Sequence, residues 1–120
     1  MAAPSADPQI VDEIRRLALA ADDIVVTRTA EDDLLARRLT VDEICAAIVD
    51  WIDAGERVKP TKLHSFPGLQ GEPAYEMKPR IDGVVFYLKV ALIKLHQPGE
   101  YLLLISAHPD HRMNRARRSQ

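Results

Sequence analysis

The segment from Tyr75 to Asp110 constrains the fold of this chain more than any other part of its sequence. It alternates apolar and polar residues, and two turn sequences interrupt it. Alternation with a period of two predicts half-buried β-strands, because side chains two residues apart lie on the same face of a sheet. The dipeptide Asp82-Gly83 predicts a two-residue hairpin, since both residues tolerate the positive φ of a type I′ turn. The segment therefore predicts three successive antiparallel strands, a β-meander.

The Asp82-Gly83 turn also predicts which residues pair. Residues equally distant from a two-residue turn lie opposite each other, so Glu76 is expected opposite Lys89 and Lys78 opposite Tyr87. One face of the hairpin then carries the polar side chains of Glu76, Lys78, Arg80, Tyr87 and Lys89. The other carries Tyr75, Met77, Phe86, Leu88, Val90 and Leu92. This second, apolar face is expected to pack on helices.

The turn near Pro98-Gly99 leaves the register of the third strand open. Proline excludes a simple type I′ loop at that point. One register places His108 opposite Lys89, on the polar face, and a shift by one residue turns it to the other face.

Two helices are expected in the first 38 residues. Asp7 is a suitable cap and Pro8 a suitable first residue for a helix over about residues 8–21. Ile24–Val26 predicts a short strand or an extended link. Thr29 is expected to cap a second helix over about residues 30–38, whose acidic first turn suits the helix dipole.

A third helix follows from a capping box. Thr40 and Glu43 have the spacing at which each side chain bonds the other's backbone N–H. Isoleucines every four residues then define an apolar stripe, and Gly55 is a natural stop. Cys45 lies beside that stripe and is expected to be a buried small hydrophobe. Trp51 is likewise expected in the core rather than as a stacking platform.

Residues 57–73 predict a long loop. Three prolines and two glycines fall within it, after a short strand around Arg57–Lys59. Lys59, Lys62 and His64 cluster there. Loops of this length in a small domain are often functional, and disorder is the competing explanation.

Composition and length predict a single domain, and the order of helices followed by strands predicts the α+β class, with N-terminal helices packed on one face of an antiparallel sheet. It spans residues 1–110, followed by a basic, disordered tail over residues 111–120. Residues 1–56 carry a net charge of −8 and residues 57–120 a net charge of +6. The basic half suggests a phosphate-bearing partner, whereas solvated helix faces and a basic tail are the simpler explanation. One cysteine, no apolar run of membrane-spanning length and no signal peptide predict a cytoplasmic protein.

The polar face of the meander is the candidate site. Clustered metal ligands and glycine-rich nucleotide loops are absent from the sequence, so no metal or cofactor is expected. A basic face with the phenol of Tyr87 and the imidazole of His108 suits metal-independent RNA cleavage. In that reaction, one side chain takes the proton of the ribose 2′-OH and another protonates the leaving 5′ oxygen. Cations stabilise the negative charge of the phosphorane. An ordinary solvated sheet face would look similar.

Two blocks of the sequence resemble one known family. Residues 26–45, VTRTAEDDLLARRLTVDEIC, are similar to the early part of the MqsR-family ribonuclease toxins, which share a Thr-Arg-Ser/Thr-Ala start and a downstream cysteine. Lys78-Pro79-Arg80, Gly83 and Tyr87-Leu88-Lys89-Val90 resemble that family's Arg-Pro-Arg, Gly and Tyr-Leu-Lys-Ile stretch. The strand Leu103–His108 looks like the family's last strand, so the resemblance covers about residues 25–108.

The resemblance implies a RelE-like fold, an endoribonuclease that cleaves mRNA, and a cognate antitoxin that neutralises it. The family's catalytic tyrosine falls on Tyr87, and its catalytic lysine on Lys59. A further family lysine falls on His108, which keeps a proton-transfer group there. The family's functional glutamine falls on Ala74 and is missing, and Gln70 lies nearby in the loop.

Two hypotheses follow. In the first, the chain is a metal-independent endoribonuclease toxin in which Tyr87, His108 and Lys59 act on RNA held by Lys78, Arg80 and Lys89. In the second, the chain is a non-catalytic module that docks a protein partner or RNA through the same face.

Overall fold

The computed structural model describes residues 5–20, 23–63, 68, 70–94 and 100–118. The first hairpin forms as the sequence predicted, with Asp82 at φ 52° and Gly83 at φ 79°. The predicted register is confirmed, because Glu76 pairs with Lys89 and Met77 with Leu88. Closer to the turn, Arg80 pairs with Val85.

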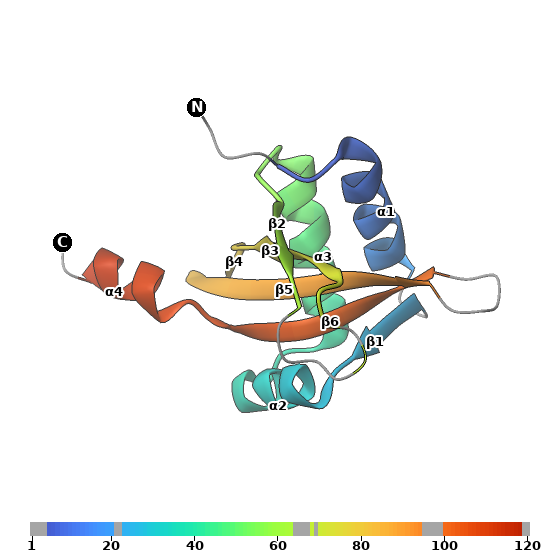
Figure 1. Ribbon diagram of the computed structural model, residues 1–120. Coiled ribbons are helices and arrows are strands. Elements are labelled where there is room, and N and C mark those ends of the chain that lie inside the picture. Colours follow the sequence, from blue (N-terminus) through green and yellow to red (C-terminus); the bar gives the residue numbers. More distant parts are fainter. Residues whose placement is uncertain (1–4, 21–22, 64–67, 69, 95–99, 119–120) are drawn as a thin grey trace.

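Within these described residues, the chain forms one six-stranded sheet and four helices (Figure 1). The strands are β1 (Ile24–Val26), β2 (Lys59–Lys62), β3 (Pro73–Met77), β4 (Arg80–Ile81), β5 (Val84–Lys94) and β6 (Glu100–Pro109). The helices are α1 (Pro8–Leu19), α2 (Arg28–Arg37), α3 (Val41–Asp53) and α4 (His111–Arg118). The strand order is β1-β6-β5-β3-β2, with β4 paired to β5.

The sheet is mixed rather than purely antiparallel, which corrects the expected fold class. β1 runs parallel to β6, with Ile24 opposite Leu102 and Val26 opposite Leu104. The α+β class and the C-terminal meander are as predicted. Two segments far apart in sequence therefore form one edge of the sheet, and no local pattern in Ile24–Val26 sets their direction.

The second helix begins two residues earlier than predicted, because Thr27 and not Thr29 is its cap. The Thr27 hydroxyl accepts a hydrogen bond from the Ala30 N–H at 3.1 Å and donates one to the Ile105 carbonyl at 3.0 Å. The Thr27 N–H also donates to the Leu104 carbonyl. Contacts with β6 thus hold Thr27 at the helix start, which local sequence alone does not show. α1 also ends at Leu19 rather than near residue 21.

The third helix follows its sequence signals. Both hydrogen bonds of the capping box between Thr40 and Glu43 are present. Gly55 follows the helix at φ 76°, a conformation that favours glycine. Cys45 is buried as expected. Burial, together with the charge of Asp42, raises the pKa of the Cys45 thiol to about 11, so it stays protonated at neutral pH.

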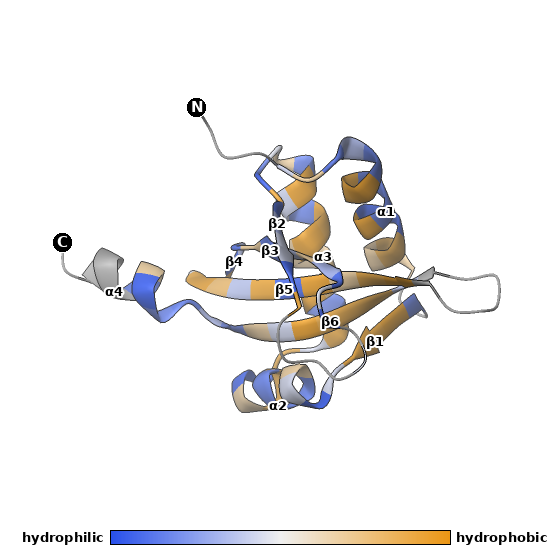
Figure 2. Cartoon of the chain, viewed as in Figure 1, coloured by the Kyte–Doolittle hydropathy of each residue, from blue (hydrophilic) through white to orange (hydrophobic). Residues whose placement is uncertain are grey.

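The main core lies between the sheet and the helices. Its fully buried side chains come from α1, α3 and the predicted apolar face, including Ile14, Ile44, Met77 and Leu88. Figure 2 shows apolar residues concentrated on α3, β5 and β6. α2 lies along β6, where the Asp33 carboxylate accepts a hydrogen bond from the Ala107 N–H at 3.1 Å. The helix thereby covers part of the β6 edge that β1 leaves free.

The register between β5 and β6 differs from the one that placed His108 opposite Lys89. His108 pairs with Tyr87, and Ser106 pairs with Lys89. A β-bulge lies at Lys89/Val90, since Val90 pairs with Leu104 and Ile105 is the extra residue. His108 keeps the predicted polar face, because the two registers differ by two residues and side-chain direction has a period of two.

Residues 111–118 form α4, where the sequence predicted a disordered tail. The Asp110 carboxylate accepts a hydrogen bond from the Met113 N–H at 3.1 Å. The Asn114 side chain accepts from the Val85 N–H and donates to the Val85 carbonyl, each at 3.0 Å. This two-way contact ties the helix to the start of β5.

Part of the predicted loop over residues 57–73 is also regular. β2 occupies Lys59–Lys62 and pairs with β3, so the short strand begins where it was expected to end. His64 lies outside the described residues. Among the helices of the described chain, none has the length and apolar character needed to cross a membrane.

Candidate functional site

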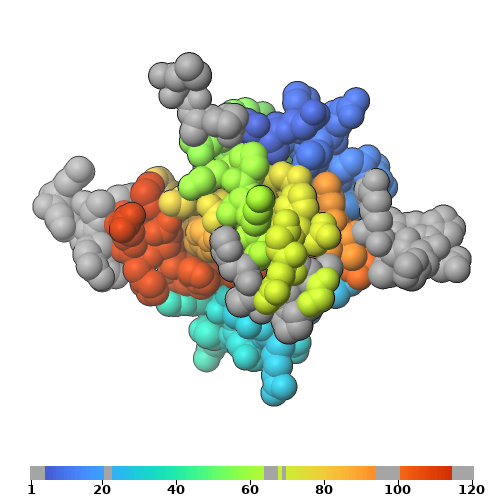
Figure 3. Space-filling view, viewed as in Figure 1, coloured from blue at the N-terminus to red at the C-terminus, as the bar shows by residue number. Residues whose placement is uncertain are grey.

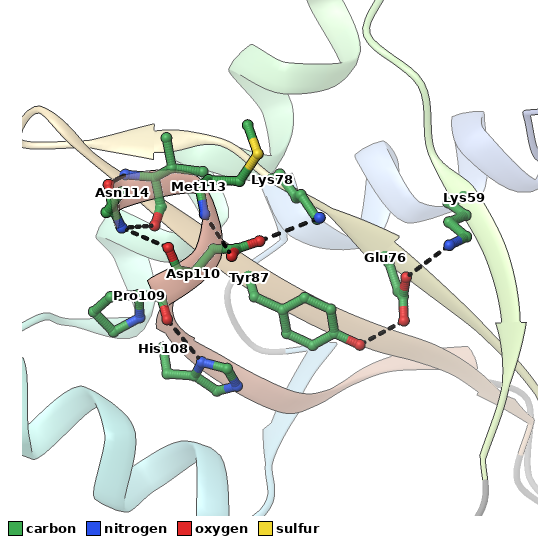
Figure 4. A network of polar contacts seen from close by, with 10 residues as sticks. Lys59, Glu76, Lys78, Tyr87, His108, Pro109, Asp110, Met113 and Asn114 are labelled. Atoms are coloured by element: carbon green, nitrogen blue, oxygen red, sulfur yellow. Dashed lines mark hydrogen bonds and ion pairs between the residues drawn. The ribbon is translucent and has the colours of Figure 1, made fainter. Parts of the chain in front are cut away.

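Three polar side chains form a row across the sheet face that the helices leave uncovered. Glu76 comes from β3, Tyr87 from β5 and His108 from β6 (Figure 4). The ladder registers bring them together, because Tyr87 is opposite His108 and diagonal to Glu76. In the space-filling view the surface of β5 is visible between β2 and the C-terminal segment (Figure 3).

Tyr87 links the other two members of the row. Its hydroxyl donates a hydrogen bond to the Glu76 carboxylate at 2.5 Å. Its ring stacks on the His108 imidazole, with centroids 5.3 Å apart and planes 21° apart. A hydrogen bond to a carboxylate is stronger than one between neutral groups. The phenol is therefore held between an acid and an imidazole.

The phenol of Tyr87 is a hydrogen-bond donor at neutral pH and not a base. Burial raises the pKa of Tyr87 well above its ordinary value. The hydrogen bond to Glu76 and the negative charges of Glu76 and Asp110 raise this pKa further. The role of a proton acceptor at this site thus falls to Glu76 or His108.

The His108 ring is oriented by its own backbone neighbour. Its Nδ1 lies 3.1 Å from the Pro109 carbonyl oxygen. A carbonyl oxygen only accepts hydrogen bonds, so this contact favours the form with a proton on Nδ1. In a neutral ring, Nε2 is then left as the acceptor.

Cationic side chains surround the row unevenly. Lys59 Nζ lies 3.9 Å from the Glu76 carboxylate, and Lys78 Nζ lies 3.2 Å from that of Asp110. The lysines are 57% and 44% exposed, so each pair contributes at most about 1 kcal/mol to stability. Lys89 is half-buried opposite Glu76, and within the described part of the chain it makes no salt bridge.

The structure thus groups four of the six predicted site residues. Lys59, Tyr87 and Lys89 contact or pair with Glu76, and His108 joins the group through its stacking on Tyr87. Lys78 is turned to Asp110 at the start of α4. Arg80 is exposed on β4, and no contact recorded among the described residues joins it to the row.

No family model, curated protein or solved structure matches this chain. In the described residues, no three side chains of His, Cys, Asp or Glu lie close enough together to hold a metal ion.

Glu76 and Asp110 are polar members of the site that the predicted set of residues left out. The hairpin register already placed Glu76 opposite Lys89, so a signal for Glu76 was present in the sequence. The sequence held no such signal for Asp110, because the place of its side chain depends on contacts with α4 and with Lys78. Burial by itself would raise the pKa of the Asp110 carboxyl. Hydrogen bonds from Met113 and Lys78 outweigh that effect, so the pKa of Asp110 is lowered.

Ala74, the residue that the resemblance aligned with a glutamine, has an apolar environment. Ala74 is fully buried in a second, smaller cluster with Leu63, Ala91 and Leu103. Ala74 lies two residues from Glu76 on the same face of β3, so a polar side chain there would lie beside the row. Gln70 is exposed in the loop before β3 and has no described contact with the row.

A cleft of about 380 Å³ adjoins the row. Its lining comes from the end of α3, the segment after it, and β2 and β3, including Trp51, Arg57 and Met77. Glu76 lines it as well, so the cleft and the row share one side chain, and Lys59 lines the cleft beside it.

Proposed function

We propose that this chain is a metal-independent endoribonuclease, and that it acts as the toxin of a toxin–antitoxin pair. The observation that carries the proposal is the row itself: Tyr87 hydrogen-bonded to Glu76 and stacked on His108. A carboxylate and an imidazole on either side of a neutral phenol provide both proton-transfer groups that RNA cleavage requires.

The proposed reaction is a transesterification. Glu76 or His108 takes the proton of the ribose 2′-OH, and the 2′ oxygen forms a bond to phosphorus. The bond from phosphorus to the 5′ oxygen breaks, and the other group of the pair gives that oxygen a proton. When RNA binds, the single O–H of Tyr87 turns from Glu76 to the phosphate and donates a hydrogen bond to it, a role that its raised pKa supports. The products are a 2′,3′-cyclic phosphate and a 5′-hydroxyl.

Four cations support binding of the RNA backbone. Lys59 and Lys89 lie beside Glu76, and Lys78 and Arg80 extend the positive charge toward β4. Attraction between such side chains and phosphates is strong at low salt and falls steeply as salt rises. In this proposal Lys59 also stabilises the charge on the phosphorane.

The family resemblance extends the proposal to fold and partner. The α+β architecture, with N-terminal helices on one face of the sheet and a C-terminal meander, is compatible with a RelE-like fold. We propose mRNA as the substrate and a cognate antitoxin protein as the partner. An adjacent small reading frame encoding a DNA-binding protein would support that partner.

The test uses a single-stranded RNA, the same sequence as DNA, and purified protein with a chelator. Cleavage of the RNA alone, with a 2′,3′-cyclic phosphate product, is expected. His108→Ala should slow it about 100- to 10,000-fold. His111→Ala, in the exposed first turn of α4, is the matched control and should leave the rate unchanged. Absence of RNA cleavage at low salt, or full activity of His108→Ala, would overturn the enzyme proposal.

Expression in cells provides a second test. Growth arrest is expected from the wild-type chain and relief from His108→Ala or Tyr87→Phe. Equal growth arrest by the wild type and both variants would show that toxicity does not depend on this site.

A non-catalytic binding module is the second candidate. Tyr87, Lys59 and Lys78 are already engaged by Glu76 and Asp110, which favours a pre-ordered surface over a reactive one. RNA binding measured by fluorescence anisotropy, without cleavage, would select this candidate.

A further inference from the structure

The cleft beside Glu76 has the composition of a binding site for an unpaired nucleobase. It combines one aromatic ring, one apolar side chain, carboxylates and cations within about 380 Å³. That volume lies in the range of small-molecule sites, which join an apolar lining to a few polar groups. Figure 4 shows Lys59, Glu76 and Lys78, three of its lining residues, next to Tyr87.

Trp51 is the aromatic part of this cleft, and it also packs against the main core, as the sequence predicted. Its side chain is half-buried, and its indole N–H donates a hydrogen bond to the Arg57 carbonyl at 3.0 Å. That bond fixes the ring while the side chain lines the cleft beside the buried Met77. Unpaired RNA bases stack on such rings, typically at about 1–3 kcal/mol per base.

The charged groups of the cleft match the two ends of a nucleotide. The carboxylates of Glu56 and Glu76 accept hydrogen bonds, and base edges present N–H donors. Arg57, Lys59 and Lys78 supply positive charge for phosphates. Glu76 also belongs to the row, so a base in the cleft would be adjacent to the groups proposed to act on the phosphate.

We propose that this cleft is a base-binding subsite, in which Trp51 stacks on one unpaired nucleobase of single-stranded RNA next to the phosphate held by the row. The inference rests on the proposed function, because it deepens the same site. Trp51 is a specificity and binding residue in it, and Glu56 contacts the edge of the base.

Fluorescence tests the subsite without cleavage. Trp51 is the only tryptophan of the chain, so its emission reports on the cleft alone. The His108→Ala variant is titrated with a short single-stranded RNA and, as a matched anionic probe, with inorganic polyphosphate of equal charge. Saturable quenching by RNA and none by polyphosphate is expected. Equal quenching by both, or none by RNA, would overturn the subsite.

Kinetics with two variants separates stacking from a structural role. Trp51→Leu should raise KM about 5- to 150-fold with kcat nearly unchanged, because the stacking of one base is lost. Trp51→Phe should restore most of the binding. An unchanged KM in Trp51→Leu, with a thermal midpoint equal to wild type, would refute the inference.

The two proposals fail differently. Quenching of Trp51 by RNA without any cleavage by the wild-type chain would keep the subsite and remove the ribonuclease. Cleavage of RNA with unchanged Trp51 fluorescence and unchanged KM in Trp51→Leu would keep the ribonuclease and remove the subsite.

Discussion

The sheet face that the helices leave uncovered has two halves that differ in burial, although the same strands build both. On one side of the β-bulge at Lys89/Val90 lie Glu76, Tyr87 and His108. On the other side lie Ala91 and Leu103, with 0% and 6% of their surfaces exposed. The half that contains Ala91 and Leu103 is a second small core, and the half that contains Tyr87 is the candidate site.

The bulge marks the boundary between these halves. Ile105 is its extra residue, and its side chain packs against the second cluster. The same irregularity shifts the pairing so that Ser106 is opposite Lys89 and His108 is opposite Tyr87. Bulges commonly re-aim side chains next to functional sites. One face can thus be both scaffold and site when its register changes midway.

The largest expected effect comes from the buried half. Leu103→Ala should lower the free energy of unfolding by about 2–5 kcal/mol, because it leaves a cavity in the second cluster. Lys89→Ala, on the polar half, should change it by about 0.5 kcal/mol or less. Urea unfolding measures both. Similar losses in the two variants would mean that the halves do not differ in this way.

A smaller loss is expected from the contact that holds α4 to the polar half. Asn114→Ala should cost about 1–3 kcal/mol, since the Val85 N–H loses its partner in a partly buried place. Trypsin should also cleave the C-terminal segment faster. Met113→Ala, on the same helix but 43% exposed, is the control. Equal protease rates for wild type and Asn114→Ala would contradict the docking of α4.

The contribution of Tyr87 to the free energy of unfolding should depend on pH in the alkaline range. Its folded-state pKa is raised, so its contribution is fully present below pH of about 10 and is lost as pH rises further. The difference in unfolding free energy between wild type and Tyr87→Phe, about 1 kcal/mol from one hydrogen bond, should be constant below that pH and shrink above it. A difference that grows with alkaline pH would contradict the burial of the phenol.

The smallest effect is expected from Asp110 in acid. Its folded-state pKa is lowered, so its contribution is present above pH of about 4 and is lost as pH falls through the folded-state value. Asp110→Asn should therefore be less stable than wild type by about 1 kcal/mol or less at neutral pH, and equal to it in strong acid. A stability difference between Asp110→Asn and wild type that does not change with pH would show that the charge of the carboxylate does not contribute to stability.

Local signals predicted those parts of the fold that depend on neighbouring residues. The Asp82-Gly83 turn gave the right register, and the capping box gave the start of α3. The start of α2 was wrong because Thr27 is held by β6, far away in sequence. α4 was missed because its basic sequence has no apolar stripe, and Asn114 ties it to Val85 instead.

The sequence alone determined the polar face with Tyr87 and Lys89, because side-chain direction in a hairpin follows from turn type and a period of two. Only the tertiary structure decided that His108 stacks on Tyr87, that β1 joins β6 in parallel and that Trp51 lines a cleft. Each of these depends on a bulge or on pairing and packing between distant segments. Such contacts form only when the whole chain excludes water from its core, and no short stretch of residues encodes them.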